Sequence, residues 1–247
     1  ATLWDSVDLG FKPTKRTWGA EVFPGSSLPN AMVQVSPVTK FHSGAGYQYE
    51  DSVIYGFTHT NKGHWNLCHI PLLPVTGTPT PGDYCSPFSH ERESAAPGYY
   101  QVFRDRYGVD AQLSSTLRCA FHKYTYPAGA APAVLADLQR SNEHVRAWDI
   151  RKEGDNVFAG WQQTGEKMYF YAVANRPVTG IEPVVEGDRE VRIVRFGEGD
   201  GALELRIGFS FVSEKNAREN LEAEMLGKSF AEVRSEATAT WNDLLGR

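Results

Sequence analysis

The stretch EVRIVRF, residues 190–196, shows most directly how this chain folds. Val191, Ile193 and Phe196 nearly alternate with arginines, so we expect a strand with one buried and one solvated face. Segments of the same kind recur from residue 32 to residue 211, separated by clusters of Gly, Pro, Asn and Asp. They are YYQVF (99–103), VDAQLSST (109–116), VFAGWQQ (157–163), KMYFYAVA (167–174) and ALELRIGFSFV (202–212). This pattern predicts a mainly β fold, an antiparallel sandwich or barrel.

Two glycine-bearing connections and one irregular segment interrupt the strands. We expect tight hairpin turns around Gly187 and in FGEGDGAL, residues 196–203. The segment AAPAVLADLQRSNEHV, residues 130–145, predicts a loop with one or two turns of helix.

Residues 213–247 have a different, helical pattern. Ser213 is a candidate N-cap, and Gly227 is expected to divide the segment into two helices. Apolar residues recur at helical spacing: Leu221, Met225, Phe230, Val233, Ala237, Trp241 and Leu244. This stripe must be covered, because contiguous apolar patches are uncommon on monomers. The sequence leaves open whether it packs back on the β domain or against another domain.

Composition excludes several classes of protein. The 247 residues are 41% hydrophobic and carry a net charge of −5 without a long basic run, which argues against nucleic-acid binding. No apolar run reaches the roughly 20 residues of a membrane-spanning segment. Three cysteines (Cys68, Cys85 and Cys119) without CxxC spacing indicate neither a disulfide framework nor a zinc site. Whether Cys68 and Cys85 meet stays open, as does the reason that the chain starts at Ala1.

The loop KGHWNLCH, residues 62–69, carries the strongest local group of binding side chains. A Trp65 ring can cover the apolar face of a pyranose, while His64 and Asn66 can pair with its hydroxyl groups. Trp65 beside an apolar run can equally belong to the core. His59, His64 and His69 are five residues apart and would alternate between strand faces, so no metal site is expected.

Several longer stretches together resemble the N-terminal β-sandwich domain of glycoside hydrolase family 92, the calcium-dependent exo-acting α-mannosidases. They are FPGSSLPNAMVQVSP (23–37), YQYEDSVIYGFTHTNKGHWNLCHIPLLP (47–74), FSHERESAAPGYYQV (88–102), LRCAFHKYTYP (117–127) and ATWNDLLGR (239–247). The resemblance implies a β-sandwich over residues 1–212. It also implies that residues 213–247 form a helical linker toward an (α/α) barrel catalytic domain that is absent from this chain.

The same resemblance implies that sugar binding and catalysis involve different domains of the enzyme. The loop with His64, Trp65 and Asn66 would form part of the sugar pocket, and His42 would reach the same cleft. The catalytic carboxylates and most calcium ligands would lie in the helical domain, so neither calcium nor hydrolase activity is expected in this chain alone. Its partners would be a mannose-containing glycan and that catalytic domain. Many bacterial relatives are periplasmic, surface-bound or secreted.

The carboxylates of this chain fit the same expectation. Glu50 and Asp51 are neighbours and would point to opposite faces of a strand. Glu91 and Glu93 are expected to be solvated loop carboxylates. Neither pair can flank a glycosidic bond as an inverting mechanism requires.

Two other functions remain compatible with the sequence. One is a stand-alone carbohydrate-binding module that uses the same aromatic loop. The other is a structural domain whose helix around Trp241 mediates assembly.

Overall fold

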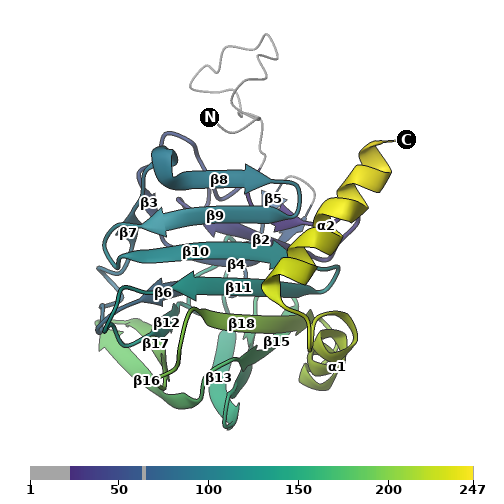
Figure 1. Cartoon of the computed structure of the whole chain (residues 1–247). Helices are drawn as coiled ribbons and strands as arrows, with labels where there is room; N and C mark the ends of the chain where they lie inside the picture. Colours follow the sequence, from purple (N-terminus) through teal and green to yellow (C-terminus); the bar gives the residue numbers. More distant parts are fainter. Residues whose placement is uncertain (1–22, 63–64, 247) are drawn as a thin grey trace.

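The structure is a computed structural model that describes residues 23–62 and 65–246. Two eight-stranded antiparallel sheets face each other as a sandwich, with both helices on one side (Figure 1). The predicted mainly β fold, with a helical segment at its end, is therefore confirmed.

The first sheet is arranged in the order β1-β2-β4-β6-β12-β17-β16, and β5 pairs with β4 alone. Its strands are β1 (Ser26–Ser27), β2 (Val33–Val38), β4 (Gly56–Lys62), β5 (Trp65–Asn66), β6 (Leu72–Val75), β12 (Ala133–Ala136), β16 (Val178–Glu186) and β17 (Arg189–Phe196). Two of its inner strands, β6 and β12, have four residues each and are buried throughout.

The second sheet has the order β13-β14-β15-β18-β11-β10-β9-β8. Its strands are β8 (Glu93–Ala96), β9 (Tyr99–Arg104), β10 (Val109–Ser115), β11 (Cys119–Thr125), β13 (Ala147–Gly154), β14 (Val157–Gln163), β15 (Lys167–Ala174) and β18 (Leu203–Ser210). A small pair, β3 (Val53–Ile54) with β7 (Ser86–Pro87), and a short 3₁₀ helix, η1 (His90–Arg92), lie at the edge.

Alternation of side chains builds the core between the sheets. In β15, every second residue is buried, and Met168, Phe170 and Ala172 join the main hydrophobic cluster. Tyr169 and Tyr171 point to the other face of the same strand and are half-buried. The strand period that was visible in the sequence therefore sets which face is inside.

Two local predictions were wrong. Residues 133–136, expected in a loop with helical turns, form β12, which lies between β6 and β17 and is completely buried. A run of four small apolar residues has no readable period, so only its two neighbouring strands define it. The segment 196–203 is no hairpin, because β17 and β18 belong to different sheets, whereas Gly187 does turn the β16–β17 hairpin.

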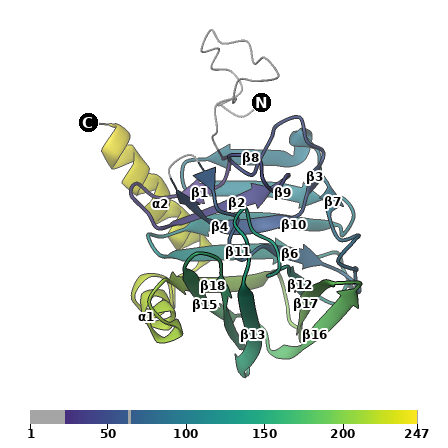
Figure 2. The same cartoon turned by 180° about the vertical axis from the view of Figure 1, so that it is seen from behind.

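The helical segment packs back on the sandwich. Helices α1 (Glu214–Glu224) and α2 (Phe230–Leu245) are separated around Gly227, whose φ is +87°, and Ser213 caps α1 as predicted. Leu221, Met225, Phe230 and Val233 cluster with the second sheet at Tyr99, Cys119 and Phe121, whereas Leu244 at the end of the stripe is exposed. Trp241 donates a hydrogen bond to the carbonyl of Ser27 at 2.7 Å. The question that the sequence left open is thus decided in favour of the β domain (Figure 2).

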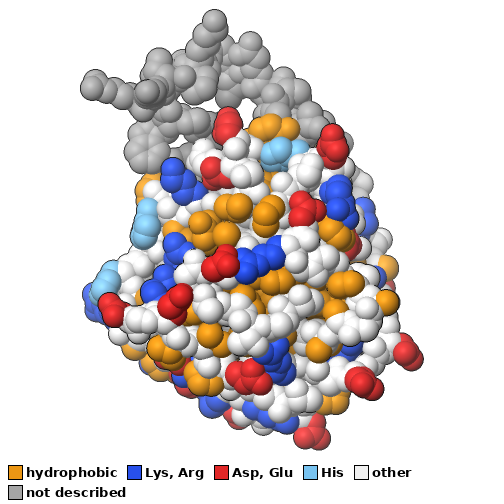
Figure 3. Space-filling model, turned by 90° about the vertical axis from the view of Figure 1, so that its left-hand side faces the viewer, with side chains coloured by type: hydrophobic (Ala, Val, Ile, Leu, Met, Phe, Trp, Pro, Cys, Tyr) orange, Lys and Arg blue, Asp and Glu red, His pale blue; other side chains and the backbone are white. Residues whose placement is uncertain are grey.

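The surface agrees with the charge balance of the sequence. On the face that Figure 3 draws, basic and acidic side chains lie next to one another and neither sign dominates. Among the described helices, none is long and apolar enough to cross a membrane.

Replacing Ser229 by Ala should lower the free energy of unfolding by about 1 kcal/mol. Ser229 forms a capping box with Glu232, in which each side chain accepts a hydrogen bond from the other residue's backbone N–H. Urea unfolding measures the change. Ser235→Ala, at an exposed position of the same helix, is the control and should not be destabilised; equal losses in both variants would rule out the capping contribution.

Candidate functional site

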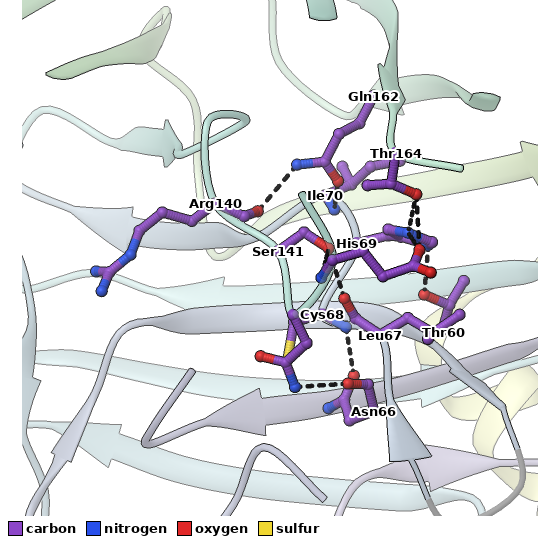
Figure 4. Close-up of polar contacts among 12 residues, drawn as sticks. Thr60, Asn66, Leu67, Cys68, His69, Ile70, Arg140, Ser141, Gln162 and Thr164 are labelled. Atoms are coloured by element: carbon purple, nitrogen blue, oxygen red, sulfur yellow. Dashed lines mark hydrogen bonds and ion pairs between the residues drawn. The ribbon is translucent and has the colours of Figure 1, made fainter. Parts of the chain in front are cut away.

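Three loops meet beside β4 and are joined by main-chain and amide contacts. Figure 4 draws the contacts between two of them, the loops that carry Asn66 to Ile70 and Arg140 to Ser141. The three loops comprise residues 39–46, 65–71 and 137–144. Asn142 lies between the other two loops: its side-chain oxygen accepts from the His42 N–H at 2.6 Å, and its amide group donates to the Asn66 carbonyl at 2.6 Å. The Asn66 N–H in turn donates to the Gly44 carbonyl at 2.9 Å. Segments that are about a hundred residues apart in the chain are thereby held as one unit.

The backbone of this junction is strained. Four non-glycine residues in the described part of the chain have positive φ, and three of them lie here: His42 (60°), Cys68 (55°) and Ile70 (53°). For a β-branched residue such as Ile70 this conformation is a true outlier. Each such residue costs on the order of 1–3 kcal/mol and persists where surrounding contacts enforce it, which is typical of functional loops.

Gln162, from the opposite sheet, forms hydrogen bonds that hold the backbone of two of these loops in place. It lies on the inner side of β14 and is completely buried. Its oxygen accepts from the Ile70 N–H at 2.8 Å, and its amide group donates to the carbonyls of Leu138 and Arg140 at 2.9 Å each. Sequence reasoning missed this residue. The available signal was a polar side chain in step with Phe158 and Gly160 in VFAGWQQ.

A second polar group surrounds His69. Its Nδ1 lies 2.9 Å from the Thr60 hydroxyl, and its Nε2 lies 3.1 Å from both Glu143 and the Thr164 hydroxyl. Burial lowers the pKa of His69, and the neighbouring Glu143 carboxylate opposes that shift only in part. The ring is 3% exposed, whereas Glu143 is 40% exposed, so the group presents a carboxylate to solvent and keeps its imidazole inside.

The four predicted binding residues have different environments. His42 is exposed at the tip of its loop, and Trp65 is half-buried in β5, opposite Lys62. Asn66 is completely buried, and its side-chain oxygen accepts from the Cys68 N–H at 2.7 Å. His64 lies outside the described residues. The structure therefore brings His42 and the Trp65 loop together, and it places the Asn66 amide where it orders that loop.

Glu93 differs from the solvated carboxylate that the sequence predicted. Its side chain is 1% exposed and accepts hydrogen bonds from Tyr47, Tyr100 and His90. The reason is that β8 begins at Glu93 and pairs it with Val102, which directs the side chain inward. Asp51 accepts from the Thr39 hydroxyl at 2.8 Å.

Residues 23–62 and 65–246 contain neither a group of metal-ligating side chains nor a disulfide bond. No three His, Cys, Asp or Glu side chains in this part of the chain converge as metal ligands would. Cys68, Cys85 and Cys119 are all free thiols.

Comparison with known proteins identifies the family. Residues 12–220 match the family model of the glycosyl hydrolase family 92 N-terminal domain. The chain belongs to this family. A family GH92 alpha-mannosidase from Bacteroides thetaiotaomicron is similar in structure, with a TM-score of 0.83 at 25% identity over 92% of this chain. Its complex with mannoimidazole gives a TM-score of 0.82 at the same identity.

A curated relative from Arthroderma benhamiae, described as an uncharacterized secreted glycosidase, is 24% identical over 92% of this chain. The family 92 domain described here spans about a third of such proteins, 36% of both the curated relative and the Bacteroides enzyme. It is thus the accessory N-terminal domain of that larger architecture.

Proposed function

We propose that this domain forms one wall of the sugar pocket in an exo-acting, inverting α-mannosidase, and that a separate helical domain supplies the catalytic carboxylates. The observation that carries the proposal is the Asn142 bridge, which fixes the His42 loop and the Trp65 loop as one rigid unit. A rigid edge of this kind presents binding groups at low entropic cost. Family membership and the relatives' names support mannose as the sugar.

Each side chain has a distinct role in this proposal. The Trp65 ring packs on the C–H face of the pyranose, and His64 and His42 pair with its hydroxyl groups. Asn66 acts through the loop that it orders, since its own amide is buried. Calcium does not fit the described residues, which offer no ligand set; the helical domain would hold it.

The remaining features follow from the same architecture. Residues 213–247 would connect the sandwich to the helical domain while packing on the second sheet. Export from the cell is proposed from the secreted relative.

Trp65→Ala in the longer enzyme should reduce kcat/KM for an aryl α-mannoside roughly tenfold. The change removes an aromatic contact with the sugar that we expect to contribute about 1.4 kcal/mol, which corresponds to a factor of ten. Steady-state kinetics and a thermal unfolding midpoint are measured together. Trp161→Ala is the matched control, since Trp161 is also half-buried but lies on β14 of the other sheet.

The isolated chain should not turn over the substrate. Turnover that is abolished by Asp51→Asn or Glu91→Gln, or an unchanged Trp65→Ala enzyme, would overturn the proposal.

A stand-alone carbohydrate-binding module is the second candidate. The sandwich itself covers the helical stripe from Leu221 to Ala237, an arrangement that needs no second domain for that part of the stripe. Millimolar binding of mannose by the isolated chain, lost in Trp65→Ala, would favour it. The assembly function is disfavoured because Trp241 is already engaged with Ser27.

A further inference from the structure

A hollow is lined by residues at the start of β13 and by Arg189 of the β16–β17 hairpin. Strands β13 and β16, which contact each other, lie side by side at the lower end of the sandwich in Figure 2. The volume of the hollow is about 480 Å³, within the usual range for small-ligand sites. The lining residues are Gln139, Val145, Arg146, Ala147, Trp148 and Arg189. Gln139 belongs to the 137–144 loop of the junction, but its side chain binds the Glu190 N–H instead of the other two loops.

Positive charge is in excess around this hollow. Arg189 pairs with the buried Asp137 at 2.6 Å, and the neighbouring Arg192 pairs with Glu190 at 2.7 Å. Arg146 is exposed and has no acidic partner among the described residues. Three guanidinium groups thus share two carboxylates.

Two of these guanidinium groups can reach a ligand in the hollow. The Arg189 side chain is 38% exposed despite its pair with Asp137, and Arg146 is exposed. The Nε–H groups of Arg189 and Arg192 are buried and lie out of a ligand's reach. The solvent-facing N–H groups of Arg146 and Arg189 can bind a carboxylate or phosphate through charge-assisted hydrogen bonds.

Trp148 adds an aromatic surface to the same wall. It is half-buried, and the Arg192 guanidinium lies 5.2 Å from the centre of its ring. An aromatic face beside a polar rim suits the C–H face of a pyranose, whereas a bare anion would leave the ring unused. Gln139 is held in place by the Glu190 N–H, which donates to its side-chain oxygen at 2.7 Å, and its amide N–H groups remain as donors.

We propose that Arg146, Arg189 and Trp148 form a second glycan site, selective for a pyranose that carries a phosphate or carboxylate group. The side chains of this site differ from those that hold the three-loop junction together, although Arg189 pairs with Asp137 of the 137–144 loop. The site would allow the domain to hold a charged branch of a glycan while another branch is processed elsewhere.

Calorimetric titration of the chain tests this site with four probes: mannose 6-phosphate, glucuronate, mannose and inorganic phosphate. At least one anionic sugar should bind at least tenfold more tightly than both mannose and inorganic phosphate. The two anionic sugars distinguish a phosphate ligand from a carboxylate ligand. Added salt should weaken the binding, since the attraction is electrostatic.

Variants separate this site from general effects. Arg146→Gln, at an exposed position, should weaken binding of the anionic sugar roughly tenfold, the effect of losing one charge-assisted hydrogen bond. Trp148→Leu should weaken it as well. The matched controls Arg218→Gln and Trp161→Leu should leave it unchanged, since Arg218 lies on α1 and Trp161 on β14.

Several results would contradict the proposed glycan site. Absence of binding, equal binding of mannose, or an unaffected Arg146→Gln variant would overturn the proposal. Inorganic phosphate that binds as tightly as the sugar phosphate would reduce the site to an anion site and overturn the glycan assignment. Trp65→Ala should leave this binding intact, so its result is independent of the mannosidase proposal.

Discussion

Acidification from about pH 7 to about pH 5 should lower the free energy of unfolding of this domain by at least about 4 kcal/mol. The main cause is a pair of histidines between the sheets, His59 of β4 and His122 of β11, and the buried His69, whose pKa is also lowered, adds to the loss. Both side chains of the pair are completely buried, and their Nε2 atoms are 3.0 Å apart. The other ring nitrogen of His122 lies 2.5 Å from the Tyr124 hydroxyl.

Burial keeps both rings neutral in the folded protein. It lowers the pKa of His59 to about 3, and it lowers the pKa of His122 well below its usual value, with the neighbouring His59 adding to the shift. In the unfolded chain both titrate near pH 6.5. Below that pH the unfolded chain binds more protons, so stability is complete above about pH 6.5 and falls progressively toward about pH 3. At about pH 5 each histidine contributes about 2 kcal/mol to the loss.

Urea unfolding at a series of pH values measures this effect. His122→Gln, which cannot titrate, should make the fall between the two pH values smaller by about 2 kcal/mol. His144→Gln removes an exposed histidine and should leave the fall unchanged. A stability that does not change over this range in the unmodified domain, or an equal fall in His122→Gln, would contradict the assignment.

Replacing Gln162 by Leu should destabilise the domain by about 3 to 5 kcal/mol. The change removes the partners of three backbone groups, on Ile70, Leu138 and Arg140, at a position with no solvent access. Each buried group left unpaired costs about 1–3 kcal/mol. The left-handed conformation of Ile70 would also lose the contact that enforces it.

Two measurements check this prediction. Denaturant unfolding gives the change in stability, and limited proteolysis reports whether residues 65–71 open locally. Gln163→Leu is the control, because Gln163 is the next residue in β14, points to the opposite face and is half-buried; its change should stay within about 0.5 kcal/mol. Equal effects at the two positions would show that the Gln162 contacts are not responsible.

Structural features that depend on residues close together in the chain could be predicted from the sequence. Strands such as residues 157–163 and 167–174 were predicted with the bounds that the structure shows, because their alternating side chains record which face is buried. The caps and the break of the two helices were equally readable, since Ser213 and Gly227 act on their own neighbours. The stretches 23–37, 47–74 and 88–102 together indicated the family that the match over residues 12–220 confirms.

Other features depended on partners far along the chain. Glu93 was predicted to be solvated because its immediate neighbours are polar, yet Tyr47 and Tyr100 enclose it. Asn142 and Gln162, which hold the candidate site together, belong to segments that carry no motif for that role. Their contacts follow from the packing of two sheets and could not be read from spacing.

By itself, then, the sequence determined the fold class, the positions of the longer alternating strands, both helices and the family of this domain. These depend on period, capping and local motifs, which act over a few residues. Only the tertiary structure decided where the helical stripe packs, that residues 133–136 form a central strand, and which loops join into one site. These depend on which surfaces meet across the sandwich, because burial and hydrogen bonding are completed between segments that are distant in the chain.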